Sequence, residues 1–126
     1  MVEKEMKVDY YDGNKNRTEI CENPETIRKI MQLRFDFPNI SNYNNFYFSE
    51  NGSNDDYTQL WIEANGNYAY LYYINNDEQW QSLNDNNDLD PNGETFFVTI
   101  EAAVNAAIEF CATKTKPTNI QWEAMW

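Results

Sequence analysis

The sequence of 126 residues predicts one α+β domain, a mostly antiparallel sheet with two helices packed on one face. Two segments, 24–34 and 100–112, follow helix-capping residues and carry apolar side chains at helical spacing. Around them, short runs alternate polar and apolar residues, and the clearest two flank Asn65-Gly66, which is a hairpin signal. Two domains would each fall below the usual domain size, so we expect a single domain over residues 1–126.

The N-terminal part is predicted to form a strand, a turn, a short extended piece and a helix. Residues 6–10 alternate apolar and polar side chains, as a half-buried strand does, and residues 12–17 are typical of a turn. Asn23 is a good N-cap, and Pro24 suits the first position of a helix. The helix should stop before residues 35–38, because the residue that precedes a proline disfavours helical backbone angles.

The middle of the chain is predicted to form a meander around a hairpin. A short strand at 46–48 interrupts a long polar loop, and further strands are expected near 79–83 and 95–98. A two-residue turn at Asn65-Gly66 would pair three residues on one face with three tyrosines: Glu63 with Tyr68, Trp61 with Tyr70 and Gln59 with Tyr72. The other face is more aliphatic and is the better candidate for helix packing; its residues are Thr58, Leu60, Ile62, Ala69, Leu71 and Tyr73.

The C-terminal part is predicted to form a helix and a last short strand. Thr99 can cap a helix that runs from Ile100 to about Ala112. The apolar stripe expected to face the core consists of Ile100, Ala103, Val104, Ala107, Ile108 and Cys111. A strand that contains Ile120 and Trp122 follows.

The charge balance indicates a basic partner. The chain has 21 acidic and 9 basic residues, which gives a formal net charge of -12. Such a chain is not attracted to nucleic acid or to anionic membranes, and its natural partners are a cationic protein surface or a cation. No apolar run reaches the roughly 20 residues that span a bilayer, and the first residues lack a secretory segment, so we expect a cytoplasmic protein.

The residue types argue against an enzyme and against a cofactor. The chain lacks histidine, which excludes imidazole-dependent triads and HExxH zinc sites. Cys21 and Cys111 lie far apart in the sequence, and we expect two small buried residues in a reducing cytosol rather than a disulfide or a reactive thiol. Residues 88–93 match the opening of an EF-hand calcium loop, but the twelfth position is Thr99 instead of Glu. A turn is the better interpretation, and no metal site is predicted.

Two groups of residues are candidates for contact with a protein partner. The first lies in an acidic stretch around the strand expected at 79–83, where carboxylates accompany a tryptophan: Asp77, Glu78, Trp80, Asp85 and Asp88. These charges would speed association with a basic cleft and the indole would fill a buried space, although a solvated loop is the simpler interpretation of the acids alone. The second group is the aromatic hairpin face with Trp61, Tyr70 and Tyr72; the sequence leaves open whether this face is buried or exposed.

The C-terminal third resembles the first immunity-protein family of bacterial polymorphic toxin systems. The likeness rests on five features: the helix entry at 97–103, the helix body at 106–110, Lys116-Pro117, Ile120, and Trp122-Glu123. The Tyr-rich hairpin is compatible with it, so the likeness covers most of residues 55–124. The family usually has Gly or a similar residue where this chain has Thr115.

The resemblance implies a small α+β protein that performs no chemistry. Such a protein binds a cognate toxin, often a nucleic-acid deaminase, and neutralises it by occluding its active site or substrate groove. This agrees with the acidic charge, because a toxin that acts on nucleic acid must attract phosphates. The alternative is another acidic binding module, such as a nucleic-acid mimic, whose carboxylates should be spaced regularly along an elongated surface. Trp122 and Glu123 match the family motif and are either structural or interfacial.

Overall fold

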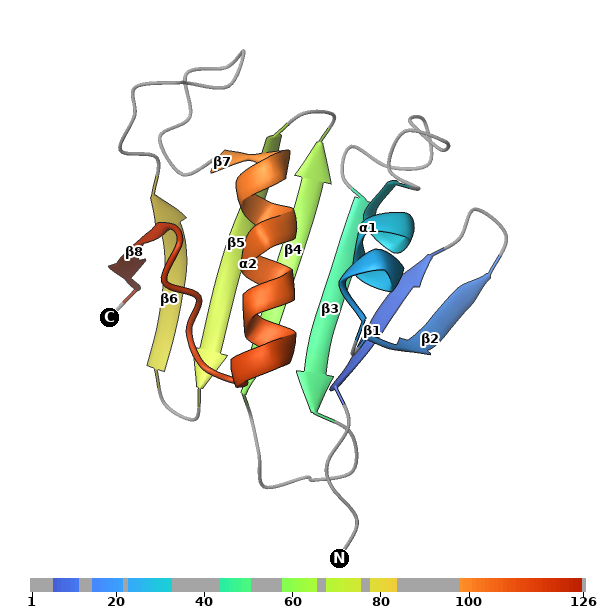
Figure 1. Ribbon diagram of the computed structural model, residues 1–126. Helices are drawn as coiled ribbons and strands as arrows, with labels where there is room; N and C mark the ends of the chain where they lie inside the picture. Colours follow the sequence, from blue (N-terminus) through green and yellow to red (C-terminus); the bar gives the residue numbers. More distant parts are fainter. Residues whose placement is uncertain are drawn as a thin grey trace, which may run out of the picture.

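The fold is a single antiparallel sheet with two helices on one side (Figure 1). The computed structural model describes residues 6–11, 15–21, 23–32, 44–50, 58–65, 68–75, 78–83 and 98–125. In this part of the chain the strands are β1 (Met6–Tyr11), β2 (Asn16–Ile20), β3 (Asn44–Glu50), β4 (Gln59–Asn65), β5 (Tyr68–Asn75), β6 (Glu78–Leu83), β7 (Val98–Thr99) and β8 (Gln121–Ala124). The helices are α1 (Pro24–Gln32) and α2 (Ile100–Thr113). The strand order is β2-β1-β3-β4-β5-β6-β8, with β7 paired to β5, and the predicted α+β class is confirmed.

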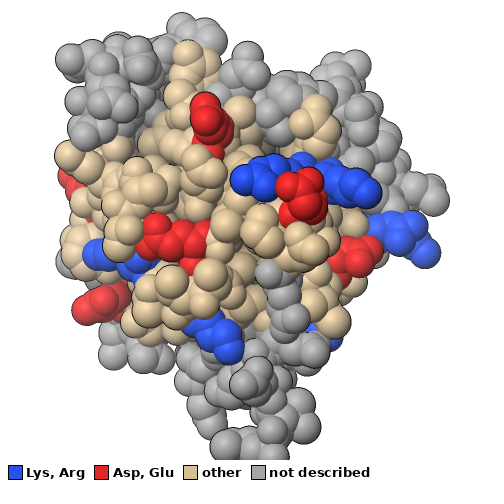
Figure 2. Space-filling model, viewed as in Figure 1, with Lys and Arg blue, Asp and Glu red and all other residues tan. Residues whose placement is uncertain are grey.

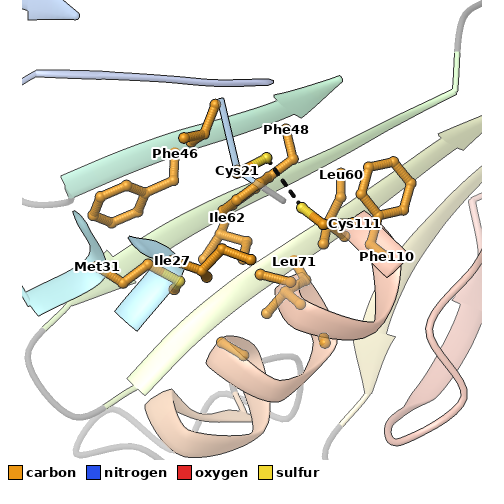
Figure 3. Packing of buried hydrophobic residues seen from close by; sticks show 14 of the residues in the cluster. Cys21, Ile27, Met31, Phe46, Phe48, Leu60, Ile62, Leu71, Phe110 and Cys111 are labelled. Carbon is orange, nitrogen blue, oxygen red and sulfur yellow. Dashed lines mark hydrogen bonds between the residues drawn. The ribbon is translucent and has the colours of Figure 1, made fainter. Parts of the chain in front are cut away.

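The core lies between the helices and one face of the sheet. Alternate residues of β1, β3, β4 and β5 point towards the helices, and the largest of those that are fully buried are Met6, Val8, Phe46, Phe48, Leu60, Ile62 and Leu71. From the helix layer, Ile27 and Met31 of α1 and Phe110 of α2 fill the same space (Figure 3). The segment expected to be a short strand at 46–48 is therefore a seven-residue strand in the middle of the sheet.

The predicted caps hold both helices at their first residues. Asn23 Oδ1 accepts a hydrogen bond of 2.8 Å from the backbone N–H of Glu25, and Thr99 Oγ1 accepts one of 3.2 Å from that of Ala102. The helix α2 ends at Lys114, which adopts the left-handed conformation with φ 61° and donates its N–H to the carbonyl of Phe110 at 2.7 Å. Local sequence signals thus determine where these helices begin.

The predicted hairpin register is wrong by two residues. Asn65 pairs with Tyr68, Glu63 with Tyr70 and Trp61 with Tyr72, so the two residues between the paired strands are 66–67 instead of 65–66. Because side chains alternate with a period of two, a shift of two residues moves no side chain to the other face. The aliphatic face packs against the helices as predicted.

The strand β5 changes its partner at a buried serine. Residues 72–75 of β5 pair with β6, whereas residues 68–69 pair with β7. Between these two stretches, the backbone N–H of Leu71 donates to Ser82 Oγ at 3.0 Å, and Ser82 is fully buried. The serine supplies the acceptor that the strand ladder lacks there, because a buried N–H without a partner is costly.

The buried stripe of α2 differs from the predicted one. Ala103, Ala107 and Cys111 are buried as expected, but Val104 and Ile108 are only half-buried, at the edge of the core. The buried residues that the pattern missed are Ala106 and Phe110. Three of the buried residues are alanines, so the largest buried side chain of α2 is that of Phe110, near the end of the helix.

Phe110→Ala should cost about 3–5 kcal/mol in the free energy of unfolding, because a fully buried ring is lost and a cavity is left. Ile108→Ala should cost clearly less, roughly 1–2 kcal/mol, because this side chain is already partly in water. Urea unfolding of both variants measures the difference. Equal losses, or a larger loss at Ile108, would show that α2 is rotated relative to the sheet.

Candidate protein-binding surface

The face of the sheet opposite α1 and α2 carries the candidate site. In the described residues both helices cover the same side, so the far side of β3 to β8 is left without a helix (Figure 1). The strand register aligns one row across it, from Tyr47 through Trp61, Tyr72 and Gln81 to Glu123. We call this surface the open face; its residues are Tyr47, Gln59, Trp61, Glu63, Tyr70, Tyr72, Gln81 and Glu123.

The aromatic rings of the open face pack against one another. Tyr47 and Trp61 meet edge to face, with ring centroids 5.3 Å apart, and Tyr70 stacks on Tyr72 at 4.6 Å. The indole N–H of Trp61 donates to Gln59 Oε1 at 2.6 Å, and 37% of Trp61 is still exposed. These contacts hold the rings in place before any partner arrives, which lowers the ordering cost of binding.

A hydrogen-bonded chain joins three strands across the same face. The hydroxyl of Tyr70 donates to Gln81 Oε1, and Gln81 Nε2 donates to Glu123 Oε2 at 3.1 Å. Burial, a hydrogen bond with the Tyr72 side chain and the charges of Glu63 and Glu123 raise the pKa of Tyr70 well above its usual value. The Tyr70 hydroxyl therefore stays protonated and can donate a hydrogen bond. This bond holds the side chain of Gln81, whose amide in turn donates to Glu123.

Glu63 is an acceptor that the described residues leave unpaired. In the register it lies between Asn45 and Tyr70, and burial raises the pKa of its carboxyl group. Burial is the cause of this shift, and no hydrogen bond to another described residue contributes to it. Beside Glu63, Asn45 Oδ1 is buried without a hydrogen-bond partner in the described part of the chain. Two such acceptors beside aromatic rings suit a guanidinium or ammonium group, which brings donors and a positive charge.

The described members of the two predicted groups of contact residues lie on opposite sides of the sheet. Trp61, Tyr70 and Tyr72 share the open face, whereas the indole of Trp80 points to the helix side and is half-buried. The ammonium of Lys116 lies over the Trp80 ring, 3.6 Å from its centroid. Glu78 is exposed at the start of β6, on the helix side by strand alternation. Figure 2 shows acidic and basic side chains interspersed on that side.

Three predicted residues, Asp77, Asp85 and Asp88, lie outside the described residues. The segments that contain them, 76–77 and 84–97, join β6 at its opposite ends. The contact role predicted for Asp77, Asp85 and Asp88 therefore stays a prediction.

Sequence reasoning missed Tyr47, Gln81 and Glu123 as members of the open face. Alternation within 44–50 and 78–83 was the available signal, but the neighbours of these strands cannot be read from one sequence. Of the two family-motif residues left open, Trp122 packs on the helix side and its indole N–H donates to the carbonyl of Pro117 at 2.8 Å. Trp122 thus packs against the core, whereas Glu123 belongs to the open face.

The described residues contain no group of three or more Cys, Asp or Glu side chains that could hold a metal ion. The calcium-like stretch 88–93 lies outside them. Neither described helix is long and apolar enough to cross a membrane.

Comparison with protein-family models and with curated proteins gives no match. The resemblance of the C-terminal third to an immunity-protein family thus gains no support from these comparisons.

Glu63→Gln should stabilise the protein at neutral pH. The pKa of the Glu63 carboxyl group is higher in the folded state than in the unfolded state. Ionisation of this group therefore destabilises the fold as the pH rises through the folded pKa. Below the unfolded pKa, about 4.3, the carboxyl group is protonated in both states and destabilises neither. The advantage of Glu63→Gln should therefore shrink as the pH falls towards about 4. Urea unfolding across this range measures it, and a difference that does not vary with pH would contradict the assignment.

Proposed function

We propose that this chain is an immunity protein that binds and neutralises a bacterial toxin acting on nucleic acid. The observation that carries the proposal is the open face, on which packed aromatic rings lie beside Glu63, an acceptor without a partner among the described residues. Aromatic side chains are the usual anchors of protein interfaces, and they cost little entropy when already ordered. The family resemblance of residues 97–123 points in the same direction.

The charge of the chain favours a basic partner. The net charge is -12, yet basic residues nearly balance the acids within the described residues. Most acidic residues fall in the other segments, including Asp55, Asp56 and the stretch 85–94. We therefore propose that the acidic segments raise the rate of association with the toxin, and that the contacts of the open face keep the rate of dissociation low.

Neutralisation requires no chemistry from this chain. A toxin groove that holds a polyanion is lined with cations, and a carboxylate such as Glu63 can take the place of a phosphate there. Aromatic rings beside it can occupy the space of a base. The protein then protects its cell by blocking the groove. On the described part of the open face, aromatic and amide side chains outnumber carboxylates, which favours this arrangement over a regularly spaced nucleic-acid mimic.

The test of function is protection. The first step is to sequence the gene immediately upstream, which the proposal expects to encode a large secreted protein with a variable C-terminal toxin domain. That domain is then expressed in a host that it poisons. Co-expression of this chain should restore growth, and the purified pair should form a complex. Wild-type protein that neither binds nor protects against that domain would overturn the proposal.

Trp61→Ala and Tyr72→Ala should each weaken the complex by about 30-fold, roughly 2 kcal/mol, mainly through faster dissociation. Trp80→Ala is the matched control, since it removes a tryptophan from the helix side. Kinetic binding measurements on variants that still unfold cooperatively compare the three. Loss of affinity in Trp80→Ala alone would move the contact surface to the helix side.

Asp85→Asn combined with Asp88→Asn should slow association and leave dissociation nearly unchanged, because distant charges act on the encounter. The effect should shrink as salt rises, since ions screen exposed charges beyond about 10 Å at 0.1 M. Association rates at several salt concentrations measure it. A slower association that is independent of salt would show that these residues act in another way.

A further inference from the structure

The two cysteines of the chain meet inside the core. Cys21 and Cys111 are 90 residues apart in the sequence, yet their sulfur atoms lie 3.1 Å apart (Figure 3). Both thiols are free, and both side chains are buried among apolar neighbours such as Phe48 and Phe110. The expected burial of both residues is confirmed, and their contact was not predicted.

The backbone places both sulfurs. Cys21 follows β2 directly, and its N–H donates to the carbonyl of Met6 at 2.9 Å, which ties it to the first residue of β1. Cys111 lies in the last turn of α2, where the Lys114 cap fixes the end of the helix. A disulfide has an S–S bond of about 2.05 Å, so the sulfurs need to approach by only about 1 Å.

We propose that Cys21 and Cys111 form a reversible oxidation site, which closes to an intramolecular disulfide when the folded protein meets a small two-electron oxidant such as hydrogen peroxide. Cys111 retains 9% of its exposure and Cys21 none, so Cys111 meets the oxidant. Its sulfur attacks one peroxide oxygen, the O–O bond breaks, and a sulfenic acid and one water form. The sulfur of Cys21 then attacks that of Cys111, the S–O bond breaks, and a second water leaves with the thiol proton.

The surroundings make this a slow reaction. A hydrogen bond with Cys21 and burial raise the pKa of Cys111 far above the ordinary thiol value, which keeps the sulfur protonated. Thiolates, not thiols, react with oxidants, so closure should take an excess of peroxide and minutes to hours. The resolving thiol is already in contact, so the sulfenic acid should be captured before further oxidation.

The bridge would join the β2–α1 junction to the end of α2 and close a long loop that contains β3 to β6. Closing such a loop restricts the unfolded chain and stabilises the folded one. The sulfurs lie on the helix side of the sheet, away from the open face. This inference does not rest on the proposed function, and its test needs no toxin.

The experiment treats the reduced, folded full-length protein with hydrogen peroxide, then alkylates it in denaturant and measures its intact mass. The wild type should lose about 2 Da and take up no alkyl group, and a dithiol reductant should restore two reactive thiols. Digestion without reductant should yield one peptide pair joined through Cys21 and Cys111. Cys21→Ala and Cys111→Ala are the controls; each should keep one reactive thiol or gain oxygen, about 16 Da or more.

A second measurement does not depend on mass. The oxidised wild type should melt about 10 °C above the reduced protein, and neither control should show this rise. Two alkyl groups on peroxide-treated wild type, or oxygen on Cys111 without a crosslink, would overturn the inference. So would a crosslink that forms only in urea, or a melting temperature that falls on oxidation, because the native fold would then not hold the sulfurs in a position to bridge.

Discussion

The burial of one face of the sheet beneath α1 and α2 is the interaction on which the rest of the structure depends. A sheet presents alternate side chains to its two sides, so a helix layer on one side commits every second residue of the central strands to the core. The side chains on the other face, which no helix covers in the described residues, must pack and form hydrogen bonds with one another. On the open face they do so through ring contacts such as Tyr70 on Tyr72, and through the chain from Tyr70 to Glu123. The surface is aromatic and yet ordered because its rings support each other.

Features that depend on neighbours in the sequence were predicted from the sequence. Thr99 and Asn23 cap their helices because a side-chain oxygen two or three residues away can reach an unpaired N–H in any fold. The hairpin was found because strand alternation and turn residues are both local. Its register was wrong by two residues, since residues 66–67 also suit a tight turn, but the division into two faces survived the error.

Features that depend on distant partners were not predicted. The sequence indicated a strand only at 46–48, inside a long loop, whereas the strand runs over 44–50 and lies between β1 and β4. In β6, a serine faces the core and Leu83 faces outward, which inverts the usual pattern and concealed the side on which Trp80 lies. Ser82 is tolerated inside because it accepts the N–H of Leu71, a need that only the assembled sheet creates. The meeting of the two cysteines has the same origin.

The two edge strands of the described sheet, β2 and β8, are poorly suited to pairing with a strand of another chain. Border strands expose unpaired N–H and C=O groups that can recruit a further strand from another chain. Here β2 carries the charged side chains of Arg17 and Glu19, and β8 has only four residues, one of them Glu123. Short edge strands with charged side chains discourage strand addition. Strand addition relies on backbone hydrogen bonds, which discriminate little between sequences. For a protein partner of the kind proposed above, selectivity would then come from the side chains of the open face, and substitutions there would leave the buried side of the sheet unchanged.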